Sequence, residues 1–380
     1  MYIQTLMLRI GVAAVFATSL LIAAHAAVVD PGVLPAEQAT LASRSLLLDI
    51  AQAGSRLVVV GERGHVLLSD NRAQTWRQAR SVPTQDLLTG VCFSDERHGV
   101  AVGHDEVVLI TADGGETWSR QHYSPEAQQP LLDVLCNGNE AIAVGAYGTY
   151  LVSSDSGATW AERKFEAKKR QGLQPGAQKV PGAKDSGTQK SGAHQPNEPG
   201  SSTARVAGPP LVQAPTHDAD EYLGEDFHLN RIVGASGSRL YIAGEAGHLY
   251  RSDDAGTTWV ELPSPYEGSF FGVLPLNGES LLAYGLRGHL FQSDDGGSTW
   301  REIKTGTQAM LNDAARLPGG GIVVAGLSGA LLVSQDNGAT YTLRQQSDRK
   351  GLSAVLPVGP TELVAAGEGG VKLIALKAGP

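Results

Sequence analysis

Cysteine, tryptophan and positive charge are scarce in this sequence, and each scarcity excludes a class of protein. The 380 residues contain 2 cysteines, 5 tryptophans and 30 Lys+Arg against 39 Asp+Glu, for a formal net charge of −9. Two cysteines are too few for a zinc or haem pattern. An acidic chain without a basic cluster does not suit nucleic acid, because phosphate binding requires concentrated positive charge. We therefore expect no nucleic-acid partner, no metal site and no cofactor.

Long hydrophobic runs are also rare, and the one at the N-terminus has the form of an export signal. Arg9 precedes an apolar run over residues 10–24, and Ala24-His25-Ala26 has the small-x-small pattern of a cleavage site. The run is short for a membrane span, although an uncleaved anchor is the alternative. We predict a signal peptide over residues 1–26 and a mature chain over 27–380 that is periplasmic or otherwise exported.

The two cysteines occupy the same place in two successive repeats. Cys92 ends the stretch DLLTGVC, and Cys136 ends the similar stretch PLLDVLC. A disulfide is stable in the oxidising compartment that an exported chain enters, but it requires a narrow range of Cα separations. The sequence therefore leaves a disulfide and two buried free thiols open.

An octapeptide box is what the sequence has in abundance. Its copies are SDNRAQTW (69–76), TADGGETW (111–118), SSDSGATW (153–160), SDDAGTTW (252–259), SDDGGSTW (293–300) and SQDNGATY (334–341). Each box follows a glycine that ends a short apolar run. Such glycines stand at Gly61, Gly103, Gly145, Gly244, Gly285, Gly326 and Gly367, with successive differences of 42, 42, 99, 41, 41 and 41. Seven repeats with one period predict a repeated architecture.

Each period contains four short apolar runs joined by glycine and aspartate turns, for example SFFGVLPL, SLLAYG, GHLFQSD and TWREIK. Four strands in a period of 40 to 50 residues are typical of a propeller blade. The sequence therefore predicts an all-β fold, a seven-bladed β-propeller of four-stranded antiparallel blades. The last repeat lacks its fourth run, so we expect residues 28–34 to supply the outermost strand of blade seven.

The third interval is longer because it contains an insertion. Residues 166–217 are rich in Gly, Pro, Ser, Gln and Lys and nearly free of large apolar side chains. Such a segment cannot bury enough surface to offset its chain entropy. We predict a disordered insertion between blades three and four, which is either a tolerated surface loop or a tether that folds on contact with a partner.

The box residues have a structural interpretation. An aspartate in a turn accepts hydrogen bonds from backbone N–H groups, and glycine adopts positive φ. The box aspartates, which could be mistaken for catalytic or calcium-binding groups, are Asp113, Asp155, Asp254, Asp295 and Asp336. The five tryptophans, expected to pack between blades, are Trp76, Trp118, Trp160, Trp259 and Trp300. We predict no catalytic residue, and no tryptophan remains to stack on a sugar.

The turns between the second and third strands supply the candidate partner-binding residues, because exposed polar loops on a rigid scaffold commonly carry recognition. These candidates are Glu62, Glu245 and Glu368 at one equivalent position, and Arg63 and Arg287 at the next. The histidines that follow the turns are too far apart around a ring to share a metal ion; they are His65, His248 and His289. Polar residues also recur on the first strands, where a small-ligand or cation site is a hypothesis: Asp49, Asp133, Asn230, Asn312 and Asp313.

The turn, strand and S/T-x-D-x-G-x-T-W box resemble the Asp-box or BNR repeat. The stretch GVCFSDERHGVAVGHDEVVLITADGGETW, which ends at Trp118, is similar to the photosystem II stability and assembly factor family. The resemblance covers residues 40–376 apart from the insertion. It implies a propeller on the lumenal or periplasmic side of a membrane that helps to assemble a membrane protein complex. The insertion departs from the family pattern, as do Asn71 and Ala73 in the first box.

Asp-boxes also occur in sialidases, so a glycan-binding or glycan-cleaving protein is the alternative. A sialidase needs an arginine cluster, a tyrosine nucleophile with a glutamate, and an aspartate acid at the propeller centre. The expected innermost strands contain only Arg231 and Arg316, with no tyrosine beside them. We therefore predict a monomeric, non-enzymatic scaffold or accessory factor for an envelope membrane protein, without a small-molecule substrate. A repeat protein with no single client is a third interpretation.

Overall fold

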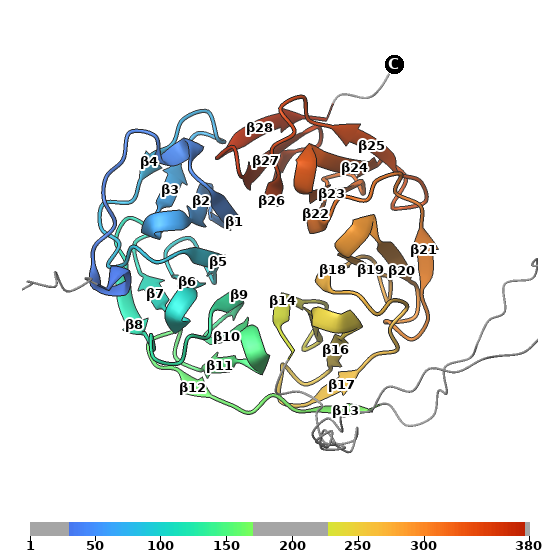
Figure 1. The fold of residues 1–380 in the computed structure, drawn as a ribbon, viewed down its shortest axis with the longest axis horizontal. Helices are drawn as coiled ribbons and strands as arrows, with labels where there is room; N and C mark the ends of the chain where they lie inside the picture. The colour runs from blue at the N-terminus through green and yellow to red at the C-terminus, as the bar shows by residue number, and fades with distance from the viewer. Residues whose placement is uncertain (1–29, 170–226, 377–380) are drawn as a thin grey trace, which may run out of the picture.

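The computed structural model describes residues 30–169 and 227–376, so the predicted signal peptide and most of the predicted insertion lie outside the described residues. Seven sheets stand around one axis as the blades of a propeller (Figure 1), which confirms the predicted fold. The first strand of each blade is innermost, and the later strands follow outward. No helix in the described ranges is long and apolar enough to cross a bilayer.

The strands are short and follow the predicted period. Blade one contains β1 (Leu47–Ala53), β2 (Arg56–Gly61), β3 (Val66–Ser69) and β4 (Arg77–Gln78). Blade two contains β5 (Leu88–Phe93), β6 (Gly99–Gly103), β7 (Val108–Thr111) and β8 (Ser119–His122). Blade three contains β9 (Leu131–Asn137), β10 (Glu140–Gly145), β11 (Tyr150–Ser153) and β12 (Ala161–Glu162). Blade four contains, from the axis outward, β14 (Leu229–Gly234), β15 (Leu240–Gly244), β16 (Leu249–Ser252), β17 (Trp259–Glu261) and the added strand β13 (Ala167–Lys169). Blade five contains β18 (Phe270–Pro275), β19 (Leu281–Gly285), β20 (Leu290–Ser293) and β21 (Arg301–Ile303). Blades six and seven contain β22 (Leu311–Arg316), β23 (Ile322–Gly326), β24 (Ala330–Ser334) and β25 (Thr342–Gln345); and β26 (Leu352–Gly359), β27 (Glu362–Gly367) and β28 (Lys372–Ala375).

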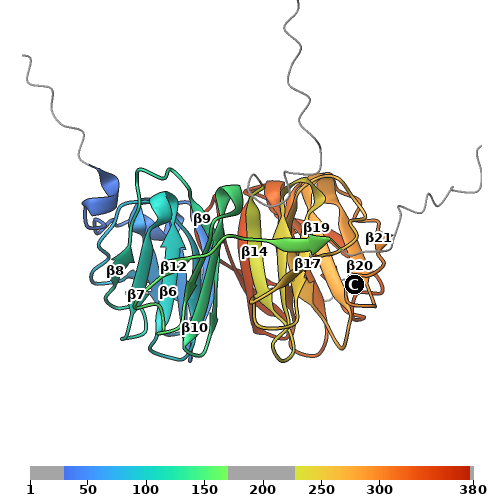
Figure 2. The same ribbon diagram turned by 90° about the horizontal axis from the view of Figure 1, so that it is seen from below.

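The glycine of each repeat ends the second strand, where the backbone passes close to the start of the first. A Cβ on Gly61 would lie 2.2 Å from the carbonyl oxygen of Leu46, so no larger residue fits there. A short 3-10 turn follows in six blades: η3 (Glu62–Gly64), η4 (His104–Glu106), η5 (Ala146–Gly148), η6 (Glu245–Gly247), η7 (Leu286–Gly288) and η8 (Leu327–Gly329). These turns line one face of the ring, the turn face, which is uppermost in Figure 2. The boxes join the third and fourth strands on the opposite face, the box face.

The hydrophobic core lies between the blades rather than within any one of them. The cluster between blades one and two contains Val58 and Leu68 of the first blade and Val91 of the second, together with Trp118 from the box of blade two. Trp160, Trp259 and Trp300 belong to the corresponding clusters of blades three, four and five. Each box tryptophan therefore packs against the preceding blade, which couples neighbouring repeats.

Residues 30–34, the described part of the segment predicted to complete blade seven, do not pair with that blade, so the prediction was wrong for them. Pro31–Val33 forms the 3-10 turn η1 beside blade two, where the Tyr123 hydroxyl donates to both carboxylate oxygens of Asp30. The chain then runs along blade one (Figure 1) to a second 3-10 turn, η2 (Ala42–Arg44). Blade seven has three strands in the described residues, and it packs directly on blade one. The apolar contact between these blades holds the ring closed without a shared sheet.

Blade four has a fifth strand, which corrects the predicted start of the insertion. Residues 166–169 were assigned to a disordered loop, but β13 pairs in parallel with the outer edge of β17 (Figure 2). Just before it, Phe165 is buried between Tyr150, Tyr250 and Trp259. The buried phenylalanine anchors the crossing from blade three to blade four. Packing therefore determines the structure of residues that composition alone assigned to disorder.

Candidate functional site

The turn face contains the predicted partner-binding residues, and the structure separates them into two groups. The three glutamates bind backbone of their own blade. Glu62 accepts from the N–H of Leu46 at 3.1 Å, and Glu368 accepts from the N–H of Gly351 at 2.9 Å. Glu245 accepts in the same way from the N–H of His228 at 3.4 Å. Each carboxylate thus caps the start of a first strand.

The two arginines of the turn face point outward. Arg63 and Arg287 occupy the apex of their turns with φ of 55°, and both are exposed. Neither forms an ion pair with another residue that the structure describes. Arg287 lines a depression of about 340 Å³ together with His289 and Lys304. These side chains are free to contact a partner, whereas the glutamates are held.

The repeated histidines pair with the fourth strand of their own blade. His248 Nδ1 lies 2.7 Å from Glu261 Oε1, and His289 Nδ1 lies 3.2 Å from Glu302 Oε1. His65 Nδ1 contacts the Gln78 amide at 3.2 Å. The described part of the chain contains no group of three or more His, Cys, Asp or Glu side chains placed to hold a metal ion.

Four ionisable side chains of the innermost strands converge near the axis, and we call them the axial cluster: Asp49, Asp133, Arg231 and Asp313. Arg231 Nη1 lies 3.0 Å from Asp313 Oδ1, and Arg231 Nε lies 3.9 Å from Asp133 Oδ2. The three aspartates are 4–9 % exposed. One guanidinium from blade four therefore compensates carboxylates from blades one, three and six, an arrangement that sequence reasoning missed because these residues lie far apart along the chain.

Each axial aspartate also holds the next blade. Asp49 Oδ2 accepts from the N–H of Val91 at 2.8 Å, a bond between blades one and two. The same contact recurs from Asp133 to Ile232 and from Asp313 to Val355, at 2.9 and 2.7 Å. The amides of Asn230 and Asn312 donate to the carbonyls of Phe270 and Leu352 on the next blade, both at 2.8 Å. The polar residues predicted to surround a ligand site thus form hydrogen bonds between neighbouring blades.

Burial and mutual repulsion perturb the axial carboxylates. Burial raises the pKa of Asp49 to about 7, although Arg231 lowers it, and Asp133 raises it further. Burial likewise raises the pKa values of Asp133 and Asp313. Burial alone would lower the pKa of Arg231, but the carboxylates keep it above its ordinary value. At neutral pH one guanidinium faces three carboxyl groups, of which Asp49 is partly protonated.

Asp49→Asn tests this charge imbalance. Because the pKa of Asp49 is higher in the folded protein than in the unfolded chain, its stabilising contribution is complete below about pH 4 and is lost as the pH rises through about 7. Asp133 and Asp313 act in the same direction. We expect Asp49→Asn, which can still accept from Val91, to raise the free energy of unfolding at pH 8 by about 1–3 kcal/mol and to flatten its pH dependence. Urea unfolding at pH 5 and pH 8 measures both; an equal effect at the two values would contradict the prediction.

The boxes form closed hydrogen-bonded turns on the box face. In blade two, Asp113 Oδ1 accepts from the N–H of Thr117 at 2.9 Å, and Oδ2 accepts from its hydroxyl at 2.7 Å. The indole N–H of Trp118 donates to the Gly115 carbonyl at 2.9 Å. Hydrogen bonds from the Thr159 side chain and backbone lower the pKa of Asp155 to about 2. In the first box Asn71 replaces the aspartate and still accepts from the N–H of Thr75 at 3.0 Å.

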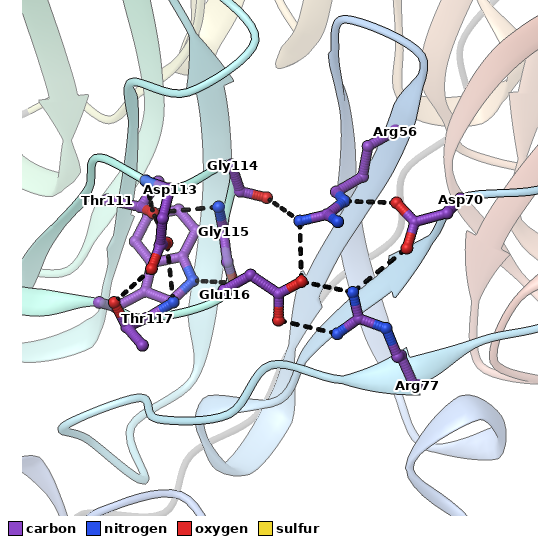
Figure 3. A network of polar contacts seen from close by, with 10 residues as sticks. Arg56, Asp70, Arg77, Thr111, Asp113, Gly114, Gly115, Glu116 and Thr117 are labelled. Carbon is purple, nitrogen blue, oxygen red and sulfur yellow. Dashed lines mark hydrogen bonds and ion pairs between the residues drawn. The ribbon is translucent and has the colours of Figure 1, made fainter.

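An ion-pair network links the boxes of neighbouring blades. Arg56 pairs with Asp70 at 2.6 Å and donates to the Gly114 carbonyl at 3.0 Å. Arg77 bridges Asp70 and Glu116, at 3.2 and 2.5 Å (Figure 3). Between blades four and five, Arg239 pairs with Asp253 and with Glu279. At these two blade boundaries the charged side chains of the box face are therefore paired with one another.

The structural role of the box aspartate predicts a moderate loss of stability. Asp113→Ala removes the acceptor for the Thr117 N–H and hydroxyl, so we expect it to lower the free energy of unfolding by about 1–2 kcal/mol. Asp113→Asn keeps an acceptor, as Asn71 does in the first box, and should cost less than half as much. Thermal unfolding compares the two variants, and equal losses would show that the hydrogen bonds to the backbone are not what matters.

Comparison with known proteins agrees with the architecture. The model of a family described as photosynthesis system II assembly factor YCF48 matches residues 44–180. None of the curated proteins searched matches the sequence. Solved structures of similar fold include one titled "YCF48 bound to D1 peptide", at 16 % identity and a TM-score of 0.60, with 92 % of this chain and 98 % of that chain covered. YCF48 from Cyanidioschyzon merolae is similar at 17 % identity and a TM-score of 0.60, with 89 % and 97 % covered. The WD40 propeller domain of Doa1 has 10 % identity and a TM-score of 0.58, with 91 % and 97 % covered. The chain is thus similar to YCF48 in sequence over residues 44–180 and in its propeller fold.

Proposed function

We propose that this protein is a non-catalytic, exported propeller that acts as a monomeric accessory or assembly factor for a membrane protein complex of the cell envelope. One observation carries the proposal. The family-model match and the YCF48 structures resemble this chain in repeat and in fold, and one of those structures is titled as bound to a D1 peptide. By analogy, this propeller recognises an exposed segment of a membrane protein.

The geometry supports recognition on the turn face. On the box face, charged side chains form ion pairs between blades one and two and between blades four and five, and the axial groups bind the next blade. Arg63 and Arg287 are exposed on the turn face without an ion-pair partner in the described residues. A rigid ring that presents free basic side chains on one face suits a partner segment with acidic groups or carbonyl oxygens.

The charged residues at the axis also argue against the glycosidase alternative. A sialidase would need an arginine cluster that is free to bind a substrate carboxylate, whereas Arg231 is paired with Asp313 and faces Asp133. The disulfide between Cys92 and Cys136 supports export, because such bonds persist in oxidising compartments.

Affinity capture from cross-linked envelope membranes tests the proposal. The baits are the tagged mature chain, a charge-reversed Arg63→Glu/Arg287→Glu variant, and a control with Arg72→Glu. Arg72 is an exposed arginine at φ of 55° in the box of blade one, on the opposite face. We expect one integral membrane protein to be enriched by the wild type and by Arg72→Glu, and to be lost with the double variant.

A fourth bait separates the insertion from the turn face. It replaces residues 170–226 by a flexible linker and keeps β13 and its Phe165 anchor. Loss of the membrane protein with this bait would assign the contact to the insertion. Background recovery from all four baits would overturn the assembly-factor proposal, and a glycan array would then test the alternative.

A further inference from the structure

Blade seven differs from the other blades in a way that exposes an apolar side chain. Leu373 stands in the third strand opposite Val364, and the same pairing position is occupied in blades one to six by Leu68, Ile110, Val152, Arg251, Gln292 and Val333. Leu68, Gln292 and Val333 are 1–8 % exposed and the other three are half-buried, whereas Leu373 is 46 % exposed. In blades one to six each of them pairs with a fourth strand, as Leu68 does with Arg77 and Arg251 with Val260. In the described residues nothing pairs with the outer side of β28.

The hydrogen-bonding directions of β28 follow from its register. The N–H of Leu376 donates to the Thr361 carbonyl, and Ile374 is opposite Leu363 on β27. Since bonds alternate along an antiparallel pair, the backbone groups of Leu373 and Ala375 point away from β27. Val371 points the same way, and its N–H is taken by the Ser43 carbonyl at 3.1 Å. Leu373 and Ala375 have no such acceptor or donor among the described residues.

Basic side chains flank this edge. Arg349 and Lys350 are exposed in the connection before β26, and neither forms an ion pair with a described residue. A Cβ on Gly369 would touch both Lys350 and Lys372, which places the two lysines beside the start of β28. Lys372 pairs with Asp348. The three cations Arg349, Lys350 and Lys372 outnumber the two neighbouring carboxylates of Asp348 and Glu368, which favours an acidic occupant.

The molecule itself shows that a blade accepts a strand from elsewhere. β13 reaches blade four from blade three and pairs with the outer edge of β17. Backbone bonds at an open edge supply affinity, and alternate side chains supply specificity.

We propose that blade seven is completed by an extended, acidic segment of a partner protein, which pairs with β28 and covers Leu373. The inference deepens the proposed function, because it assigns the client segment to a sheet edge. It predicts main-chain recognition at blade seven in addition to side-chain contacts on the turn face.

The experiment uses a synthetic peptide with the sequence of residues 257–262, TTWVEL, which forms the fourth strand of blade four and contains an acidic residue. Hydrogen exchange of the mature chain is followed with this peptide at about 1 mM, a concentration suited to a short strand ligand. We expect the amides of Leu373 and Ala375 to exchange rapidly in the free protein and to be slowed about tenfold by the peptide. A scrambled peptide should have no effect.

Substitutions at Leu373 separate the contribution of its backbone N–H to peptide binding from that of its side chain. Leu373→Pro removes an outward N–H and leaves the bonds to β27 in place, a change that edge strands tolerate; it should abolish the protection while the protein stays folded. Leu373→Ala should weaken binding, whereas Val33→Ala, which shortens an exposed apolar side chain beside blade two, should not.

Two results would overturn the inference. In one, the peptide leaves both amides unprotected. In the other, the free protein already protects them, because its own residues outside the described ranges or a second copy cover the edge. Dependence of that protection on protein concentration separates these two sources. Capture of the same membrane protein by wild type and Leu373→Pro would leave the proposed function standing while rejecting the strand site.

Discussion

Arg231→Met is expected to lower the free energy of unfolding at pH 8 by about 3–5 kcal/mol, the range for removing one partner of a buried ion pair. Methionine keeps much of the aliphatic packing but removes the cation that faces Asp313 at 3.0 Å and Asp133 at 3.9 Å. Three carboxylates from three blades would then lie near the axis with no counter-ion. The loss should exceed that of any surface ion pair, because exposed pairs contribute at most about 1 kcal/mol.

Acid should rescue this variant. Because burial raises the pKa values of the axial carboxyl groups, that of Asp49 to about 7, they bind protons as the pH falls from 8, and the missing guanidinium leaves progressively less charge uncompensated. We expect the loss to shrink by more than half between pH 8 and pH 4.5, as measured by urea unfolding. The double variant Arg231→Met/Asp49→Asn should recover part of the stability at pH 8. A loss that is the same at both pH values would show that packing, not charge, makes Arg231 important.

Removal of the disulfide is the second large effect. Cys92 on β5 and Cys136 on β9 are bonded with a Cα–Cα distance of 5.6 Å and a sequence separation of 44, and the bond links blades two and three. A cross-link over a loop of this length stabilises a protein by about 2–4 kcal/mol, chiefly by restricting the unfolded chain. We expect Cys92→Ala/Cys136→Ala to lower the melting temperature by several degrees in non-reducing buffer.

Reductant distinguishes the bond from the packing of the two side chains. Dithiothreitol should lower the melting temperature of the wild type to that of Cys92→Ser/Cys136→Ser and should leave the double serine variant unchanged. A wild-type protein that melts at the same temperature with and without reductant would contradict the assignment. The sequence left the pairing open because equivalent positions in a repeat do not specify a distance; the packing of adjacent blades brings the two Cα atoms within bonding range.

Much of the propeller could be predicted because its signals are local and repeated. The box places an aspartate, a glycine and a tryptophan within one turn, and those contacts span at most a few residues, as between Asp113 and Thr117. The glycine period identifies the blades for the same reason, since the close approach of Gly61 to Leu46 recurs in each repeat. Even the altered first box follows the rule, because the Asn71 amide oxygen accepts the same hydrogen bond.

The misplaced segments depend on contacts that are distant in sequence. Residues 28–34 have strand-like composition, but Asp30 is held at blade two by Tyr123. Residues 166–169 have the composition of a linker, but the burial of Phe165 directs them onto blade four. Composition describes what a segment can do alone, and neither contact is visible from composition.

The candidate binding residues divide in the same way. The turn sequences showed which side chains stand at the apex, and Arg63 and Arg287 are indeed exposed there. The turns did not show that Glu62 would accept the N–H of Leu46, 16 residues earlier in the chain. Whether a polar turn residue is free for a partner depends on the backbone that approaches it.

By itself, the sequence determined the strand period, the number of blades and the hydrogen-bonded box, because each of these rests on contacts within one repeat. Only the tertiary structure decided how the ring closes, which cysteines and charges meet, and where a sheet edge stays open. Arg231 and Asp313 are 82 residues apart in number but 3.0 Å apart in space. Leu373 is exposed, whereas the residues at the same pairing position in the other six blades are buried or half-buried, because blade seven has no fourth strand in the described residues. Such features arise from contacts between blades, and the sequence of a single repeat does not specify those contacts.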